Sequence, residues 1–303
     1  MLPKFPEFKQ LTLDDKDDCN RVTVELNPYS DYIFTVLWCW NLKETTQVST
    51  LNGNLVFAFD DCFIKDRFFS FIGKRNVAET SLTLLQSAKR FGLSSFLRLV
   101  PDVTASRLRE NTAFNIEDDR NNFDYIYLVE NLRDLPGNRY SEKRKLANRF
   151  ERKFRWEALK LNLRSEEHKR AIVDLFHLWQ MQKTLEDLEV KNEFTALNRL
   201  LNALPMLSLR AIGIFVGKQL IAFAIFEVIQ RGYGAVYFEK ADRRYDGVYQ
   251  HLKRLLGAEL SREGCRYVSV EQDLGIDTLR KTKLSYRPAF FLEKVSVSLA
   301  NSD

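Results

Sequence analysis

Cysteine and histidine are scarce in this chain of 303 residues, which has four of the former and three of the latter. The cysteines lie far apart in the sequence, at Cys19, Cys39, Cys62 and Cys265. None belongs to a CxxC pair or stands at zinc-ligand spacing from a histidine, so the pattern argues against both a zinc finger and a disulfide framework. We therefore expect reduced thiols in the core and no metal site.

Long apolar runs are also missing. The N-terminal segment 1–18 has no apolar stretch of the kind found in secretory signal peptides. The most apolar segments, residues 32–40 and 212–229, are too short or are interrupted by charges such as Lys218 and Glu227. A membrane-spanning helix needs about 20 apolar residues. The sequence therefore predicts a soluble, cytoplasmic protein without a transmembrane segment.

Several catalytic signatures are absent as well. The chain has no GxGxxG or GxxxxGK[ST] phosphate loop, no HExxH helix and no GxSxG turn, so the enzyme classes that use them are poor candidates. What the chain does have is 45% hydrophobic and 13% aromatic residues, which is enough to build about two domains of ordinary size.

The two halves of the chain show the same order of predicted elements. Each half has a helix, a β-hairpin, a second helix, a strand, a short helix and a final strand. The first hairpin is expected over 53–72 and is followed by a helix over 80–91, a short helix around 106–111 and a strand over 123–130. The second is expected over 211–239 and is followed by a helix over 247–262. This order predicts an α/β (α+β) architecture with mixed sheets flanked by helices.

Matching residues recur at a fixed distance of 171 positions. The pairs are Leu84 and Leu255, Asp102 and Asp273, and Arg109 and Arg280. A period this long indicates duplicated domains rather than a solenoid. We predict an N-terminal domain over 1–139, a basic linker helix over 140–155 and a C-terminal domain over 156–303.

Positive charge is concentrated around the linker. Residues 133–170 contain thirteen basic and six acidic side chains, although the whole chain has a net charge of only +5. A basic amphipathic helix of this kind binds phosphates or forms a solvated linker, and composition alone leaves both open. The candidate RNA- or phosphate-binding residues are Lys143, Arg144, Asn148, Arg149 and Arg152.

A second candidate site lies at residues 267–288. A predicted strand delivers two carboxylates to its C-terminal end, and a helix after Gly275 brings cationic side chains close behind. This combination is suited to holding an amine and a phosphate or ester together, with a tyrosine as proton donor. The candidate catalytic residues are Glu271, Asp273 and Tyr286, and the substrate-binding residues are Arg280 and Lys283. The alternative is a structural salt-bridge network with Tyr286 as a half-buried anchor.

A weaker signal precedes the helix at 247–262. Arg244-x-x-Gly247-x-Tyr249 resembles the loop with which GNAT acyltransferases bind the pyrophosphate of their cofactor at a helix N-terminus. Arg244 and Gly247 are candidate substrate-binding residues for this reason. Tyr249 stands where a small residue is expected and would crowd a pyrophosphate. The alternative is that Asp246 and Gly247 form a simple turn.

Two motifs resemble a bacterial family, the C-terminal, catalytic domain of phosphatidylglycerol lysyltransferases, which also occurs as stand-alone proteins. The first is Leu135-Pro136-Gly137-Asn138-Arg139-Tyr140 with Lys143-Arg144 and Asn148-Arg149-Phe150. The second, which is longer, is Glu271-Gln272-Asp273-Leu274-Gly275 with Leu279-Arg280-Lys281, Lys283, Ser285-Tyr286 and Pro288. The chain departs from the family pattern at Lys145 and Ser269, and it carries no membrane-spanning half.

The resemblance implies two tandem GNAT-like domains and aminoacyl transfer from an aminoacyl-tRNA to an acceptor that the sequence does not identify. A peptide, a small molecule or a lipid headgroup would each serve, although the missing membrane half puts a lipid in doubt. Two alternatives stay open. One is an acyl-CoA-dependent N-acyltransferase using acetyl-CoA, and the other is a non-catalytic tRNA- or nucleotide-binding protein on a GNAT scaffold.

Overall fold

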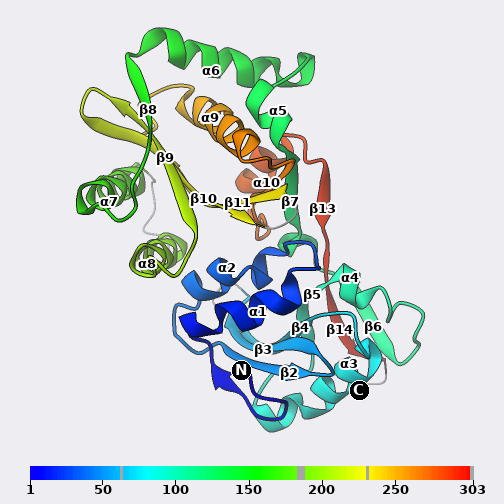
Figure 1. The fold of residues 1–303 in the computed structure, drawn as a ribbon. Coiled ribbons are helices and arrows are strands. Elements are labelled where there is room, and N and C mark those ends of the chain that lie inside the picture. Colours follow the sequence, from blue (N-terminus) through cyan, green and yellow to red (C-terminus); the bar gives the residue numbers. More distant parts are fainter. Residues whose placement is uncertain (62–63, 183–187, 230–231, 301–303) are drawn as a thin grey trace. The chain divides into compact units, whose positions relative to one another are not determined.

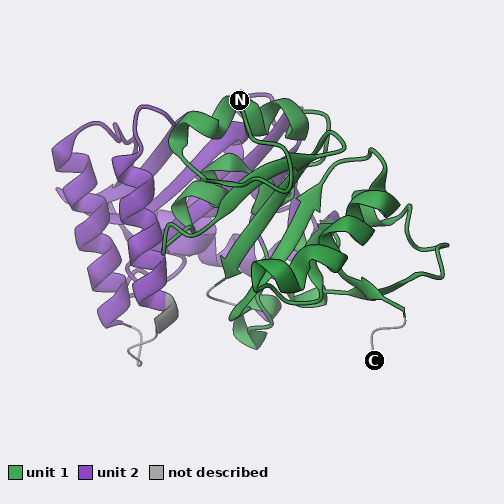
Figure 2. Ribbon diagram, turned by 90° about the horizontal axis from the view of Figure 1, so that it is seen from below, with its two compact units in different colours: residues 1–124, 272–280, 291–303 green, residues 125–271, 281–290 purple. Residues whose placement is uncertain are grey.

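The computed structural model describes residues 1–61, 64–182, 188–229 and 232–300. The chain forms two compact units, each built from segments that are not contiguous in sequence (Figure 2). Unit 1 contains residues 1–124, 272–280 and 291–303, and unit 2 contains residues 125–271 and 281–290. Each unit is described by itself below.

Unit 1 contains a mixed sheet with the strand order β1-β2-β3-β4-β5-β14-β6 (Figure 1). Its strands are β1 (Lys9–Gln10), β2 (Gln47–Leu51), β3 (Asn54–Asp61), β4 (Asp66–Ile72), β5 (Leu97–Pro101), β14 (Lys294–Leu299) and β6 (Phe114–Asp118). β3 and β4 form the predicted hairpin, in which Leu55 pairs with Ile72. β4 and β5 run parallel, whereas the other neighbours are antiparallel.

Helices cover both faces of this sheet. The unit's helices are α1 (Lys16–Thr23), α2 (Phe34–Cys39), α3 (Val77–Ala88) and α4 (Asp102–Ala105). Alternate strand residues such as Val56 and Phe71 pack with Leu84 of α3 in one core. The opposite face carries Phe57 and Ser70, and both contact Tyr32, which precedes α2. Alternation of the side chains thus gives each face of the sheet its own apolar layer.

Unit 2 contains a second mixed sheet with the order β13-β7-β12-β11-β10-β9-β8. Its strands are β13 (Phe290–Leu292), β7 (Asp124–Leu128), β12 (Tyr267–Ser269), β11 (Tyr233–Ala241), β10 (Gln219–Ile229), β9 (Leu209–Val216) and β8 (Trp156–Lys160). β11 and β12 run parallel, as β4 and β5 do in unit 1. β10, which pairs with a strand on each side, is buried from Leu220 to Glu227, which accounts for its nearly continuous apolar sequence.

The helices of unit 2 are α5 (Val129–Asp134), α6 (Ser141–Lys153), α7 (Glu166–Met181), α8 (Leu188–Asn202) and α9 (Val248–Arg262), and α10 (Asp277–Leu284) crosses the boundary of the units. α7 and α8 lie on one side of the sheet and α9 on the other (Figure 1). α9 approaches β11 closely, since a Cβ built on Gly234 would lie 2.6 Å from Leu260. Single turns of 3₁₀ helix lie at Leu13–Asp15, Ser30–Tyr32, Lys89–Phe91, Arg120–Asn122 and Asn138–Tyr140.

The units are not contiguous in sequence because each sheet includes a strand from the other half of the chain. β7 follows the first-half elements in sequence but pairs with β12 in the second sheet. β14, the last strand of the chain, pairs with β5 in the first sheet. The division therefore differs from the contiguous domains 1–139 and 156–303 expected from sequence, because local patterning does not reveal which sheet a strand joins.

The duplication is visible in equivalent contacts within each unit. Asp102 and Arg109 form an ion pair of 2.7 Å after β5. Asp273 and Arg280, which stand 171 positions later, form an ion pair of 2.7 Å after β12. α3 and α9 begin after residues at equivalent positions, Asn76 and Gly247, and both have a left-handed backbone. These matches and the two mixed sheets confirm the predicted α/β class.

Several elements differ from the sequence prediction. The short helix expected near Ser106–Asn111 is one turn over Asp102–Ala105, and the strand expected to end at Glu130 stops at Leu128, where α5 begins. α1 and α8 are additional. Within the described ranges, no helix is long and apolar enough to cross a membrane.

Candidate functional site

The strand-end site predicted over 267–288 is divided between the two units. Asp273 and Arg280 belong to unit 1, whereas Glu271, Lys283 and Tyr286 belong to unit 2. The contacts of each set are therefore considered within its own unit.

Asp273 is fully buried and holds a turn in place. Arg280 donates to its two carboxylate oxygens over 2.7 and 2.9 Å, and Arg120 lies 3.2 Å from one of them. The backbone N–H of Gly275 donates to the same carboxylate over 2.9 Å. These contacts are those of a loop anchor, in which Arg280 is engaged as well. The catalytic role of Asp273 and the substrate-binding role of Arg280 stay predictions.

Lys283 and Glu271 meet at the end of the β12 segment in unit 2. The Lys283 ammonium donates to the backbone carbonyls of Val270 and Glu271, the latter over 3.1 Å. It also lies 5.6 Å from the centre of the Tyr125 ring. Glu271 has a left-handed backbone with φ of 58°, a conformation that costs a non-glycine residue about 1 kcal/mol or more. Lys283 therefore fixes a strained backbone at the position where the predicted site begins.

Tyr286 lies in a cluster of cationic and aromatic side chains. The ammonium groups of Lys143 and Lys253 lie 4.6 and 5.2 Å from the centre of its ring. The side chain is buried, and its hydroxyl has no hydrogen-bond partner among the described residues. Burial raises the pKa of this phenol above its ordinary value. A phenol in these surroundings stays protonated at neutral pH and is available to donate one hydrogen bond.

The two lysines of the cluster differ in their partners. Lys253 on α9 pairs with Glu239 of β11 over 2.6 Å. Lys143 on α6 is half-buried, and no carboxylate among the described residues lies within ion-pair distance of it. Burial, with the neighbouring Lys253, lowers the pKa of Lys143. Lys143 thus has no counterion among the described residues. Its ammonium form is suited to meeting an anionic group, and its neutral amine, which the lowered pKa favours, to accepting a proton.

Tyrosines hold the backbone of this cluster. The Tyr140 hydroxyl donates to the carbonyl of Tyr286 over 3.0 Å, and the Tyr127 hydroxyl donates to the carbonyl of Lys283 over 2.8 Å. Sequence reasoning singled out Tyr286 and Lys143 but missed Tyr127, Glu239 and Lys253. Their signal was weak, because each is a single polar group within an apolar strand or an amphipathic helix.

The loop before α9 does not have the open form of a pyrophosphate site. A Cβ built on Gly247 would lie 2.1 Å from the carbonyl oxygen of Leu146, so α6 packs directly against the N-terminus of α9. Arg244 donates hydrogen bonds to both carboxylate oxygens of the buried Asp242. The Tyr249 hydroxyl accepts from the N–H of Ala241 over 3.2 Å. The helix terminus is therefore covered by α6, whereas Tyr249 is anchored at the end of β11.

The basic residues of α6 divide into two groups. Arg144 donates to the carbonyls of Leu135 and Gly137, and Asn148 accepts from Arg254 over 3.0 Å. Arg149 pairs with Asp246 over 2.6 Å. Arg152, Lys153 and, just beyond the helix, Arg155 are exposed. Of the five residues predicted to bind phosphate, Arg152 is exposed, and no carboxylate among the described residues lies within ion-pair distance of it. Arg144 and Asn148 are hydrogen-bonded within the unit, and the phosphate-binding role of all five stays a prediction.

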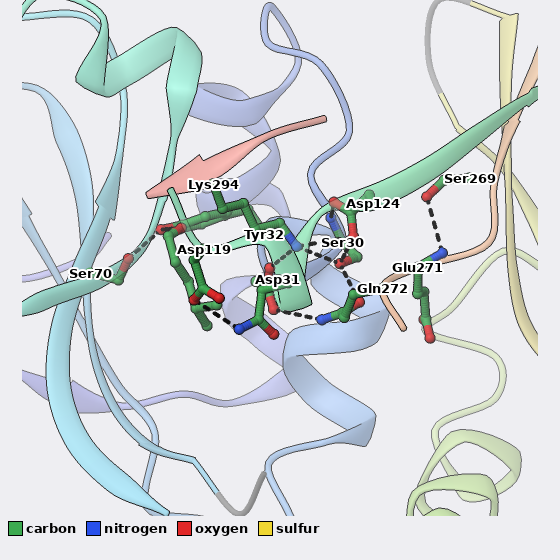
Figure 3. A network of polar contacts seen from close by, with 12 residues as sticks. Ser30, Asp31, Tyr32, Ser70, Asp119, Asp124, Ser269, Glu271, Gln272 and Lys294 are labelled. Carbon is green, nitrogen blue, oxygen red and sulfur yellow. Dashed lines mark hydrogen bonds and ion pairs between the residues drawn. The ribbon is translucent and has the colours of Figure 1, made fainter. Parts of the chain in front are cut away.

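Unit 1 contains a buried charged network that the sequence analysis missed (Figure 3). Lys294 of β14 is fully buried and lies 3.0 Å from a carboxylate oxygen of Asp124, and it also pairs with Asp31. Ser30 donates to Asp124 through its backbone N–H over 2.8 Å and through its hydroxyl. Gln272 donates to Asp31 over 3.3 Å.

The network balances two carboxylates against one ammonium. Burial raises the pKa of Asp124, against the opposing effect of Lys294. Burial alone would lower the pKa of Lys294, but Asp124 and Asp31 outweigh it and the pKa is raised. The available signal was a lone charge inside each apolar strand, since such a charge needs a buried partner. Across the described part of the chain, no group of three or more His, Cys, Asp or Glu side chains is placed to hold a metal ion.

Comparisons with known proteins agree with the motifs. The family model "Phosphatidylglycerol lysyltransferase, C-terminal" matches residues 24–297. A conserved protein of unknown function from Bacteroides thetaiotaomicron is 26% identical and has a TM-score of 0.86, covering 99% of this chain and 100% of that one.

Two more distant structures share the fold. L-PGS from Bacillus licheniformis is 11% identical with a TM-score of 0.61, covering 100% of this chain and 95% of that one. FemX is 10% identical with a TM-score of 0.58, covering 97% and 98% of the two chains. No curated protein matches the chain.

Proposed function

Because the chain belongs to the family of the phosphatidylglycerol lysyltransferase C-terminal domain, we propose that it takes an aminoacyl group from an aminoacyl-tRNA and transfers it to an acceptor. Family membership supports an acyltransferase of the aminoacyl type. The donor and a cytoplasmic location, where charged tRNA is found, are parts of the proposal.

The contact between Gly247 and Leu146 is the observation that supports aminoacyl-tRNA rather than acetyl-CoA as the donor. In acyl-CoA-dependent enzymes of this fold, the cofactor pyrophosphate binds backbone N–H groups at the equivalent helix terminus. In unit 2 the backbone of α6 lies against that terminus, so a pyrophosphate has no room there. This favours a donor held by other means, and it disfavours the acetyl-CoA alternative.

The transfer itself needs a proton to move. The acceptor nucleophile forms a bond to the ester carbonyl carbon, the bond from that carbon to the tRNA oxygen breaks, and the acceptor's proton ends on the departing oxygen. Lys143 has a lowered pKa and no counterion within the described part of the chain, and it is the group that we propose takes this proton in its neutral form. The Tyr286 hydroxyl, which has no partner among the described residues, lies in the same cluster and is free to donate to a substrate oxygen.

The exposed cations at the end of α6 would hold tRNA phosphates. Arg152, Lys153 and Arg155 point their charges to solvent, in contrast to Lys143 and Arg144. Each phosphate contact adds to the salt dependence of binding. For contacts to a duplex, the slope of log K against log salt concentration changes by about 0.9 per phosphate.

A salt titration of tRNA binding tests this arrangement. We expect Arg152→Ala with Lys153→Ala to weaken tRNA binding and to lower the salt slope by about 1 to 2. Lys89→Ala with Arg90→Ala, which removes two exposed cations from unit 1, is the matched control and should change neither quantity. Equal affinity and slope for both double variants would remove α6 from the RNA-binding surface.

A further inference from the structure

Unit 1 contains a pocket that takes no part in the proposed transfer. It lies beside α2 and the C-terminal end of β3, and its wall includes Asp31, Trp40, Asn41, Phe59, Asp60 and Asp61. Three of these side chains are carboxylates, two are aromatic and one is an amide. The pocket therefore combines negative charge, aromatic rings and a directed polar group.

The charged side chains that line the pocket are carboxylates, those of Asp31, Asp60 and Asp61. Asp31 shares the buried Lys294 with Asp124, so two carboxylates face one ammonium. Asp60 pairs with Lys43 over 3.0 Å, and Asp61 accepts the backbone N–H of Ile64 over 2.7 Å. A lining whose charged groups are carboxylates favours a cationic ligand. Aromatic walls add to this preference, because ring faces attract ammonium groups.

Asn41 supplies an independent sign of a ligand. Its side chain is only 5% exposed, and its Oδ1 accepts the backbone N–H of Thr46 over 3.1 Å. This bond fixes the orientation of the amide, so Nδ2 is the remaining donor. Among the described residues Nδ2 finds no acceptor. A buried donor of this kind is unfavourable unless something else satisfies it.

We infer that this pocket binds a small organic ammonium ion that also carries a carbonyl or carboxylate oxygen, which is the chemistry of an amino acid or its amide. The ammonium would meet the carboxylates and the rings, and the oxygen would accept from Asn41 Nδ2. The inference does not rest on the proposed function, because it concerns binding without a tRNA donor.

Nuclear magnetic resonance of the indole N–H groups provides the readout. Trp40 lines the pocket, whereas Trp156 and Trp179 belong to unit 2 and serve as internal controls. We expect glycinamide to shift the Trp40 signal, which a Trp40→Phe spectrum identifies. Ethylamine has the ammonium group without the carbonyl oxygen, and acetamide has the oxygen without the ammonium group. Each should bind at least about tenfold more weakly than glycinamide. Glycine in place of glycinamide distinguishes a carboxylate from an amide ligand.

Two variants separate the contribution of the Asn41 donor from that of the carboxylates. Asn41→Asp keeps the acceptor for Thr46 but loses the donor, so glycinamide should bind about tenfold more weakly while ethylamine loses nothing. Asp60→Asn should weaken both ligands several-fold. Asp118→Asn, which changes an exposed, paired carboxylate of β6, is the matched control and should bind as the parent does. The backbone spectrum reports whether each variant is folded. An unmoved Trp40 signal, or equal glycinamide binding by folded Asn41→Asp and parent, would overturn the inference.

Discussion

The helix that follows the hairpin begins in the same way in both units but in different surroundings. In unit 1, Asn76 precedes α3 with φ of 42° and is exposed. In unit 2, Gly247 precedes α9 with φ of 85° and lies against the backbone of α6. The duplicated scaffold thus keeps the left-handed turn in both units. α6, which stands in sequence between the repeats, has covered the turn in one of them.

The ion pairs after the equivalent strands show the same divergence. Asp102 and Arg109 are 35% and 44% exposed, whereas Asp273 is fully buried. Equivalent ion pairs in the two units therefore need not contribute equally to stability. Unit 2 carries the covered helix terminus and the cationic cluster, and unit 1 carries the pocket.

Substitution of the two left-handed residues should give the largest difference between the units. Gly247→Ala adds a Cβ that meets the Leu146 carbonyl and must adopt a disfavoured φ, so we expect a loss of about 4 kcal/mol in the free energy of unfolding. In Asn76→Ala the new residue must adopt a disfavoured left-handed backbone but meets no such contact. We therefore expect a loss of about 1 kcal/mol in the free energy of unfolding. Urea unfolding of both variants measures this. Equal losses would mean that α6 does not press on Gly247.

The two aspartates provide a smaller contrast. Asp273→Asn leaves Arg280 and Arg120 without their buried carboxylate and should destabilise the protein by about 3 kcal/mol. Asp102→Asn removes an exposed pair and should cost less than about 1 kcal/mol. Thermal unfolding at matched pH compares them. A mild effect of Asp273→Asn together with lost activity would instead support its predicted catalytic role.

Acid should act on unit 2 through His251, whose equivalent in unit 1 is Thr80. Burial lowers the pKa of His251 to about 4, although Glu151 at 3.0 Å opposes this. The unfolded chain therefore binds a proton between about pH 6.5 and 4 that the native chain does not, and stability falls as the pH is lowered through that window. The shift in the pKa of His251 corresponds to about 3 kcal/mol of unfolding free energy.

Replacement of the histidine tests this assignment. His251→Phe should flatten the dependence of unfolding free energy on pH between 7 and 4, measured by urea titration. Thr80→Val in unit 1 is the matched control and should keep the parent slope. A slope that survives in His251→Phe would assign the acid sensitivity to other groups.

The smallest effects are expected from substitution of two buried tyrosines, one in each unit. Tyr32 in unit 1 contacts Ser70 over 2.5 Å and donates to the carbonyls of Phe71 and Leu99, so Tyr32→Phe should cost about 1 to 2 kcal/mol. Tyr286 has a hydroxyl without a partner among the described residues, so Tyr286→Phe should be neutral or stabilising by about 1 kcal/mol. Calorimetry checks both. Strong destabilisation by Tyr286→Phe would contradict the description of its surroundings.

Local patterns predicted the hairpins and the long helices because periodicity and glycine caps act over a few residues. The hairpin of β3 and β4 follows from such signals, and so does α3 with the 3₁₀ turn Lys89–Phe91, which ends before Gly92 with φ of 65°. The placement of β7 and β14 does not, because strand pairing depends on surfaces that form only in three dimensions. The same limit explains the missed network, in which Asp124 and Lys294 are 170 positions apart.

The candidate site was predictable in part. The spacing of Asp273 and Arg280 showed that a charged pair follows the strand, but it did not distinguish an anchor from a catalytic group. Full burial of Asp273 favours an anchor, and that burial depends on neighbours that the local spacing does not reveal. Lys143 was predicted as a phosphate ligand because its helix is basic, whereas its half-buried position over Tyr286 depends on how α6 packs.

The most direct test of the central claim is a donor comparison under single-turnover conditions. Labelled aminoacyl-tRNA and labelled acetyl-CoA are each incubated with the protein and the small-molecule and lipid fractions of a bacterial lysate, and transfer of label is followed from pH 6 to 9. We expect transfer from aminoacyl-tRNA alone, rising with pH in the parent as Lys143 loses its proton. In Lys143→Arg, which keeps the charge but cannot give up its proton, transfer should be slow and should lack that rise. Transfer from acetyl-CoA with none from aminoacyl-tRNA would contradict the account.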